Sequence, residues 1–257
     1  MILEIPASIG RSTLNRIQIL GRSGVFLLIS LYQAFVPPFR LFRLIKEVEF
    51  IGSKSILIVF VTGLFTGMVL GLQGHHTLTQ FGAEALLGSA VALSIIRELG
   101  PVLCALMVTG RAGSAMTAEI GIMKITDQFP ALEMMAIDPL KYVISPKIIA
   151  GILSLPLLTA FFDVVGIFGG YLVGVKLLGV NEGAYFGKMV TAVTFTDIYG
   201  GVVKSLSFGL LIAWICSFMG YTAQATTEGV SRATTQAVVY TSLSILIMDY
   251  ILTSLLL

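Results

Sequence analysis

The sequence predicts an all-α fold, an integral membrane helical bundle, and two observations carry that prediction. Hydrophobic residues fill 56% of the 257 positions and charged residues only 12%, with a mean hydropathy of +0.95. A soluble domain carries about 25% charged residues. In addition, residues 55–83 contain no Asp, Glu, Lys or Arg. A helix needs about 20 such residues to cross the roughly 30 Å hydrocarbon core of a bilayer.

Apolar runs divide the chain into about five transmembrane helices. We expect them near residues 56–72, 85–109, 145–175, 202–221 and 233–257. Ser145 is expected to cap the third of them, with Pro146 in its first turn, where the missing N–H is not needed. We treat residues 1–257 as a single domain, in which residues 51–257 form the transmembrane bundle.

Residues 1–50 form an N-terminal region for which we expect an interfacial helix. Arg11, Arg16 and Arg22 precede a short apolar run at residues 25–36, which Pro37 ends. That run is too short to span a bilayer, and basic residues beside apolar ones suit a helix that lies among lipid headgroups. No small-residue cleavage site follows the run. A cleaved or inserted segment is the alternative.

The distribution of basic residues predicts the orientation, because cytoplasmic segments carry more Lys and Arg than external ones. With the N-terminus inside, the cytoplasmic segments hold Arg11, Arg16, Arg22, Arg40, Arg43, Lys46, Lys54, Arg111, Lys124, Lys141, Lys147 and Arg232. The other side keeps Lys176 and Lys188, with Lys204 at a helix end. We therefore expect a cytoplasmic N-terminus and an external C-terminus.

A charged segment at residues 111–145 follows the second expected span and predicts a short pair of cytoplasmic helices. Ser114 or Thr117 is expected to cap the first helix, and Pro130 to end it or to start the second. The second is expected to end at Asp138, since a residue before proline avoids the helical conformation. The pair suits docking into a groove on a partner protein, and a helix lying on the bilayer is the alternative.

Two adjacent charges, Arg97 and Glu98, interrupt the second expected span just before Gly100 and Pro101. Because proline has no N–H, the carbonyl of Arg97 loses its helical donor. Ionisable residues inside a membrane are costly and usually mark a transport pathway. The alternative is that both residues lie nearer the membrane surface than the span limits suggest.

Glycine recurs at every fourth position in two of the expected helices. Gly63, Gly67 and Gly71 form one stripe, and Gly166, Gly170 and Gly174 form the other. Such stripes let helix backbones approach closely. We favour packing within the chain, with the seam of a homodimer as the alternative.

Several kinds of chemistry are not expected. The chain has no Gly-x-x-x-x-Gly-Lys-Ser/Thr phosphate loop, so it is not expected to hydrolyse ATP. Its two histidines are adjacent, at His75 and His76, which leaves a metal site short of ligands. A net charge of +2 gives no reason to expect nucleic acid binding. No residue is assigned a catalytic role.

Five stretches of the chain resemble the MlaE permease family. They are LSIIRELGP at 93–101, GRAGSAMTAEIG at 110–121, LEMMAIDP at 132–139, GMVLGLQG at 67–74 and GVSRATT at 229–235. Phe129 and Pro130 depart from the family pattern inside the charged segment. The resemblance implies the permease subunit of an ABC transporter in the bacterial inner membrane, which works as a homodimer and moves phospholipids between the inner and outer membranes to maintain outer-membrane lipid asymmetry.

The resemblance also implies partners and roles for particular residues. The partners are an ABC ATPase (MlaF) that holds ATP and magnesium, a STAS-domain subunit (MlaB) and a hexameric MCE-domain protein (MlaD). Leu70 and Leu78 would contact lipid acyl chains, Arg97 would bind a phosphate and Glu98 would gate the polar end. The residues that would couple the chain to the ATPase are Glu119, Lys124, Asp127, Glu133 and Asp138.

Two other functions remain compatible with the residues themselves. A proton-linked secondary transporter would use Arg97, Glu98 and Asp163 as a relay. A scaffold that anchors peripheral proteins would need none of these charges for its function. Replacing Arg97 and Glu98 by apolar residues separates the two, because only the scaffold would keep its activity.

Overall fold

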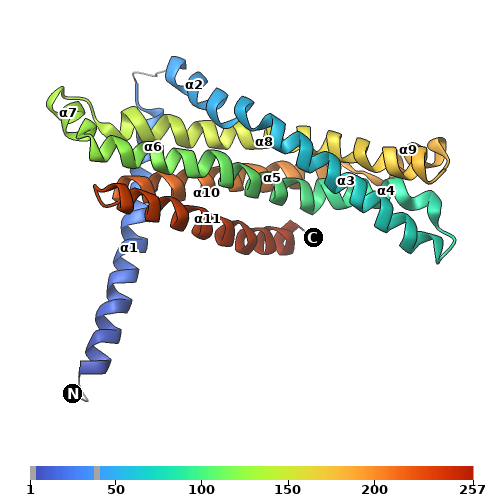
Figure 1. The fold of residues 1–257 in the computed structure, drawn as a ribbon, viewed down its shortest axis with the longest axis horizontal. Coiled ribbons are helices and arrows are strands. Elements are labelled where there is room, and N and C mark those ends of the chain that lie inside the picture. Colours follow the sequence, from blue (N-terminus) through green and yellow to red (C-terminus); the bar gives the residue numbers. More distant parts are fainter. Residues whose placement is uncertain (1–3, 38–40, 257) are drawn as a thin grey trace.

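The computed structural model describes residues 4–37 and 41–256, and that part of the chain is a bundle of α-helices without strands (Figure 1). In chain order the helices are α1 (Glu4–Phe35), α2 (Leu41–Ile51), α3 (Ile56–Thr79), α4 (Leu87–Ser94), α5 (Gly100–Val108), α6 (Ser114–Ile125), α7 (Gln128–Met134), α8 (Ser145–Tyr171), α9 (Glu182–Ala192), α10 (Phe195–Thr222) and α11 (Thr227–Leu256). Turns of π-helix at Ile95–Leu99 and Thr109–Gly113 join α4, α5 and α6 into one run. The prediction of an all-α membrane bundle is confirmed.

Six helical runs in the described residues are long and apolar enough to cross a membrane, one more than we expected. Five of them contain the expected spans, and the sixth is Ile17–Phe35 at the end of α1. The expectation that this region is too short was wrong, because the helix begins well before the apolar run, at Glu4. Arg40 and the side chains of Arg11 and Arg16 lie outside the described residues.

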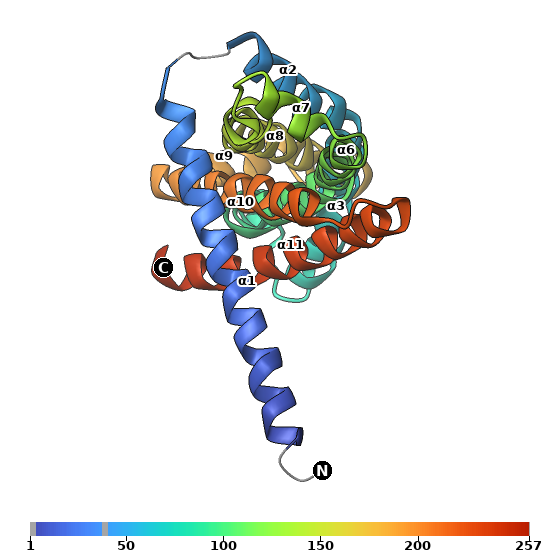
Figure 2. The ribbon, with the colours of Figure 1, turned by 90° about the vertical axis from the view of Figure 1, so that its left-hand side faces the viewer.

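Helix α1 runs across the long axis of the bundle and projects beyond it at the N-terminal end (Figures 1 and 2). Its second half is attached to the bundle: the indole N–H of Trp214 donates to the carbonyl of Ser23 at 2.8 Å, and the ring of Phe26 lies 5.5 Å from that of Phe218. A helix perpendicular to a membrane-spanning bundle lies along the membrane plane. This arrangement favours the interfacial placement, which stays a prediction.

The two glycine stripes face one another where α3 packs against α8. A Cβ atom added to Gly67 would lie 1.8 Å from the carbonyl oxygen of Gly166, and one added to Gly71 would lie 3.0 Å from that of Gly170. A Cβ atom added to Gly63 would lie 3.2 Å from the carbonyl oxygen of Phe162. The stripes are therefore buried inside one chain and do not form a homodimer seam. Close backbone contact of this kind stabilises helix pairs in membranes by dispersion.

Three expected helix ends were wrong because helices continue through them. Residue 114 starts no new helix, since the π turn carries the second span into α6, where Thr117 lies inside the helix. Neither Ser114 nor Ser145 caps a helix with its side chain, although α8 begins at Ser145 with Pro146 in its first turn, as expected. The hydroxyl of Ser145 instead donates to the carbonyl of Ser30 at 2.8 Å, which ties α1 to α8. Helix α10 begins at Phe195, where Thr194 and Asp197 form a capping box, so Lys204 lies inside the helix.

The predicted helix near Pro130 is present as α7, but it ends at Met134, before Asp138. Left-handed backbone conformations bracket it, at Asp127 with φ 53° and at Ala136 with φ 56°. Such conformations are unfavourable for residues with a Cβ atom. They hold α7 at a sharp angle to α6, at the end of the bundle away from α9 (Figure 1).

We predict that Gly67→Ala destabilises the fold, because the added methyl group must push α8 away from α3. Overpacking of a tight contact costs about 1–3 kcal/mol. The measurement is the thermal unfolding midpoint of the purified protein in detergent, followed by the fluorescence of Trp214. Gly110→Ala is the matched control, since its Cβ would meet nothing within 4 Å. Equal midpoints for the two variants would contradict the packing described here.

Candidate functional site

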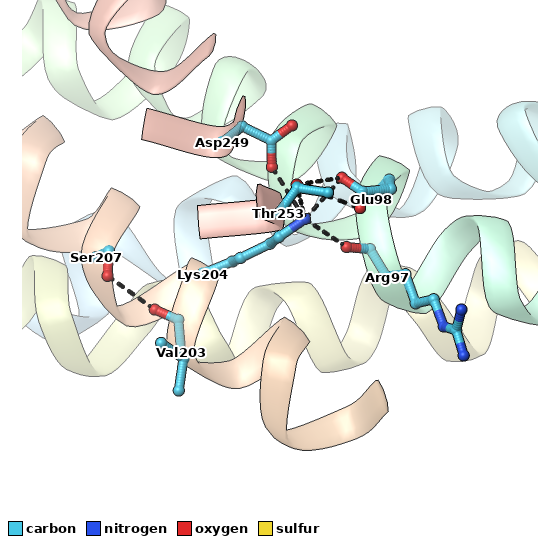
Figure 3. Close-up of polar contacts among 7 residues, drawn as sticks. All are labelled: Arg97, Glu98, Val203, Lys204, Ser207, Asp249 and Thr253. Carbon is cyan, nitrogen blue, oxygen red and sulfur yellow. Dashed lines mark hydrogen bonds and ion pairs between the residues drawn. The ribbon is translucent and has the colours of Figure 1, made fainter. Parts of the chain in front are cut away.

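A buried lysine is the centre of a polar cluster inside the bundle, and the lysine comes from α10. Lys204 is only 2% exposed. Its ammonium nitrogen lies 2.6 Å from a carboxylate oxygen of Glu98, 3.2 Å from Asp249 and 2.8 Å from the hydroxyl of Thr253 (Figure 3). Glu98 belongs to the π turn before α5, whereas Asp249 and Thr253 belong to α11. The cluster therefore joins three helical segments through one cation.

The proline in this region explains the fourth contact of the lysine. Pro101 cannot donate to the carbonyl of Arg97, and the helix widens there into a π turn. Lys204 donates to that free carbonyl at 2.8 Å (Figure 3). The sequence predicted the free acceptor but not its donor. An unpaired carbonyl inside a bilayer costs several kcal/mol, so this contact stabilises the widened turn.

The side chain of Arg97 points away from the lysine (Figure 3). Its Nε lies 2.7 Å from a carboxylate oxygen of Asp197, the residue that closes the capping box at the start of α10. Arg97 and Glu98 thus pair with different charges, as expected for neighbouring residues on a helix. Both keep partly exposed side chains, 46% for Arg97 and 41% for Glu98, whereas their partners Asp197 and Lys204 are buried.

This arrangement can hold a polar group inside an apolar bundle, because it offers partly exposed charges whose positions are fixed by buried partners. A guanidinium suits a phosphate oxygen, since it presents several N–H donors in one plane. The side chains around the Lys204 ammonium include two carboxylates and one hydroxyl, those of Glu98, Asp249 and Thr253.

The leucines assigned to acyl chains lie on another helix. Leu70 and Leu78 are both on α3, about two turns apart, and both are partly buried against the hydrophobic core. Helix α3 contributes none of the side chains that contact Lys204 among the described residues. Leu70 and Leu78 therefore lie on α3, whereas Arg97 and Glu98 lie in the π turn before α5.

Two of the five residues assigned to ATPase coupling make contacts within the bundle. A carboxylate oxygen of Glu119 lies 2.8 Å from the ammonium of Lys147, and Lys124 donates to the carbonyl of Tyr221 at 2.9 Å. Asp127 forms the left-handed joint before α7. These three residues fix the position of α6 and α7 against the bundle.

The other two, Glu133 and Asp138, lie together at the surface. Both line an open pocket of about 390 Å³ that also includes Ile137 and Tyr221. Asp138 accepts a hydrogen bond from the backbone N–H of Leu140 at 2.9 Å and another from the side chain of Gln33. Glu133 is exposed beside Met134 and Met135, which are 83% and 62% exposed. The surface offers acidic and flexible apolar groups together, a composition that suits a protein partner.

Sequence reasoning missed the lysines and the acid at α10. Lys204 was placed at a helix end and Lys147 among the cytoplasmic charges, yet both are buried, and Asp197 was not considered. The available signal was a single lysine within an apolar run, which requires a carboxylate partner. Asp163 proved separate from the cluster: its carboxylate lies against Gly100, where an added Cβ would be 1.9 Å away, and one of its oxygens has no hydrogen-bond partner.

We predict that Lys204→Met destabilises the protein by about 3 kcal/mol, because it leaves Glu98 and Asp249 without their cation. The free energy of unfolding in detergent is the measurement. Lys204→Arg keeps the charge and should lose less than half as much stability. Unchanged stability in the methionine variant would show that the ionic cluster contributes nothing to the fold.

Comparison with known proteins agrees with this picture along the whole chain. The family model described as Permease MlaE matches residues 44–255. The chain is 46% identical to the intermembrane phospholipid transport system permease protein MlaE of Haemophilus influenzae, over 99% of this chain and 98% of that protein. It is 41% identical to a probable ABC transporter permease protein of Rickettsia bellii, over 99% and 98%. It is 33% identical to the chloroplastic protein TRIGALACTOSYLDIACYLGLYCEROL 1 of Arabidopsis thaliana, over 82% and 60%. The family model and these relatives identify this multi-pass membrane protein as a member of the MlaE permease family of ABC transporter permeases.

Proposed function

We propose that this chain is the permease subunit of an ABC transporter that moves phospholipids between the inner and outer membranes of a bacterium and so maintains lipid asymmetry. The observation that carries the proposal is the pair of partly exposed charges, Arg97 and Glu98, held inside an apolar bundle by buried Lys204 and Asp197. A phospholipid has a phosphate for such a guanidinium and acyl chains for the apolar surroundings. The printed name of the Haemophilus relative supports the same cargo.

The proposed assembly is a homodimer of this chain in the inner membrane, with the N-terminus in the cytoplasm. Its partners are the ATPase MlaF, the STAS-domain subunit MlaB and the hexameric MCE-domain protein MlaD. The acidic pocket beside α7 supports an ATPase contact at Glu133 and Asp138. Leu70 and Leu78 would line the apolar part of the lipid cavity.

In the proposed mechanism, ATP hydrolysis in the partner moves α6 and α7, and the two permease chains repack around the lipid. Such a cycle needs a helix interface with two arrangements, and it needs no catalytic residue in this chain. ATP and magnesium belong to the partner. The run from α4 to α6 is continuous through two π turns, so a displacement of α6 has a direct helical path to Arg97 and Glu98.

A proton-linked secondary transporter is not favoured. Its relay would need Arg97, Glu98 and Asp163 to share a path, but Arg97 pairs with Asp197 and Glu98 with Lys204. The matched family also consists of ABC permeases.

We predict that native mass spectrometry of the complex, purified through a tag on this chain, finds two copies of it together with an ATPase and retained phospholipid. The mass of the intact assembly and of its dissociated subunits is the measurement. A lone chain without lipid that transports along an ion gradient in the absence of ATP would instead establish a secondary transporter.

We predict that Glu133→Lys weakens ATPase association by about tenfold or more. The substitution replaces a carboxylate with an ammonium group, which would repel a basic partner surface that is complementary to Glu133. The measurement is the amount of ATPase that copurifies with equal amounts of folded permease. Glu228→Lys is the matched control, since Glu228 is also an exposed glutamate on a helix, paired only with exposed Arg232 among the ion pairs of the described residues. Equal retention of the ATPase by both variants would remove Glu133 from the contact.

A further inference from the structure

A second buried lysine, Lys147 at the start of α8, holds two carboxylates that come from different helices. Its side chain is fully buried, and its ammonium nitrogen lies 2.9 Å from both carboxylate oxygens of Glu47 and 2.8 Å from one of Glu119. Glu47 belongs to α2 and Glu119 to α6. A buried ammonium needs such partners, because burial of an unpaired charge is strongly unfavourable.

Two of the three joined helices, α2 and α8, also pack against one another, whereas α6 packs mainly against α10 and α11. The Lys147 cluster, defined here as Lys147, Glu47 and Glu119, is therefore a polar connection between two parts of the bundle. Glu119 keeps a 45% exposed side chain, while that of Glu47 is only 10% exposed.

The ring of Phe50 braces the same connection at the end of α2. Three cations lie near it: the guanidinium carbon of Arg111 is 4.9 Å from the ring centre, and the ammonium groups of Lys54 and Lys147 are 5.6 Å and 5.9 Å from it. Arg111 also donates to the carbonyl of Phe50. Since Arg111 lies in the π turn that leads into α6, the end of α2 is tied at two points to the run that contains α6.

Helix α2 has one face in the bundle and one face outside it. Leu41, Phe42 and Ile45 are exposed apolar residues, at 66%, 73% and 64%, and Lys46 is exposed between them and the buried Glu47. An exposed apolar face beside a basic residue suits contact with lipid at the membrane surface. Helix α2 also leads through a single 3₁₀ turn, Ser53–Ser55, into α3, which carries Leu70 and Leu78.

We propose that Lys147 is a positioning residue that makes α2 move together with α6. Displacement of α6 and α7 then reaches α3 and the lipid cavity through α2, in addition to the path through the run from α4 to α6. The inference rests on the proposed function and deepens it. It gives Glu119 a role within the permease, acting through Lys147, in addition to any contact with the ATPase. Lys147 is fully buried and acts through the two carboxylates that it contacts.

The test measures lipid moved per ATP hydrolysed by the purified complex in liposomes, with a fluorescent phosphatidylethanolamine as the cargo. We expect Lys147→Met to lower this ratio by about fivefold or more, the lower range of coupling between sites, while ATP hydrolysis and assembly persist. Lys147→Arg should restore the ratio, because a guanidinium also bridges two carboxylates. Lys188→Met is the matched control: it removes the same charge from an exposed position of α9, outside the Lys147 cluster.

Glu47→Ala provides a second variant in case Lys147→Met does not accumulate, because it leaves Lys147 paired with Glu119 and breaks only the link to α2. A lowered ratio in Glu47→Ala supports the inference. A wild-type ratio in either Glu47→Ala or a folded Lys147→Met overturns it and leaves the proposed function intact. Absence of ATP-dependent lipid movement by the wild-type complex would overturn the proposed function and this inference together.

Discussion

An ammonium group withdrawn from water must be surrounded by carboxylates and carbonyl oxygens, and this requirement determines how the charged parts of the molecule are built. Lys204 and Lys147 are almost fully buried. Each gathers acidic side chains from two other helical segments, Glu98 and Asp249 in one case, Glu47 and Glu119 in the other. Because the alternative is an unpaired charge in a medium of low dielectric, these helices cannot separate freely. The charges specify which helices meet, while apolar packing supplies most of the contact area.

The closest helix contact in the bundle depends on the opposite property, the absence of side chains. Between α3 and α8 the glycine stripes bring backbone against backbone at Gly67 and Gly166. Lipid offers no competing attraction of comparable density, so dispersion at short range holds the pair. The result is a rigid α3–α8 unit, with the tunable ionic clusters lying on its flanks. That division suits a permease that must change shape without unfolding.

Much of this organisation could be predicted from the sequence, and the parts that could not share a cause. Hydropathy located five of the six runs that are long and apolar enough to cross a membrane, and spacing predicted the glycine contact. Proline chemistry predicted the free carbonyl of Arg97. The predictions of helix caps failed at Ser114 and Ser145. Both residues are common at helix starts, but a π turn directly before each of them continues the helix. The partners Lys204 and Asp197 lie about 100 residues from Glu98 and Arg97, and local pattern contains no information on contacts between such distant segments. Distinguishing the surface acids Glu133 and Asp138 from the internally paired Glu119 needed the tertiary structure for the same reason.

The π turns have a consequence for how this chain tolerates changes in length. A wide turn contains one residue more than a standard α-helix would hold, and one residue rotates everything beyond it by about 100°. Deleting a single residue at 95–99 or at 109–113 would convert the wide turn into ordinary α-helix and leave the faces on either side in phase. Deleting a residue within α5, which has no wide turn to absorb the change, would rotate α6 so that Glu119 faces away from Lys147. Single-residue deletions should therefore be tolerated better in the two π turns than within α5, because register, as well as side-chain chemistry, keeps the two ends of this long helix aligned.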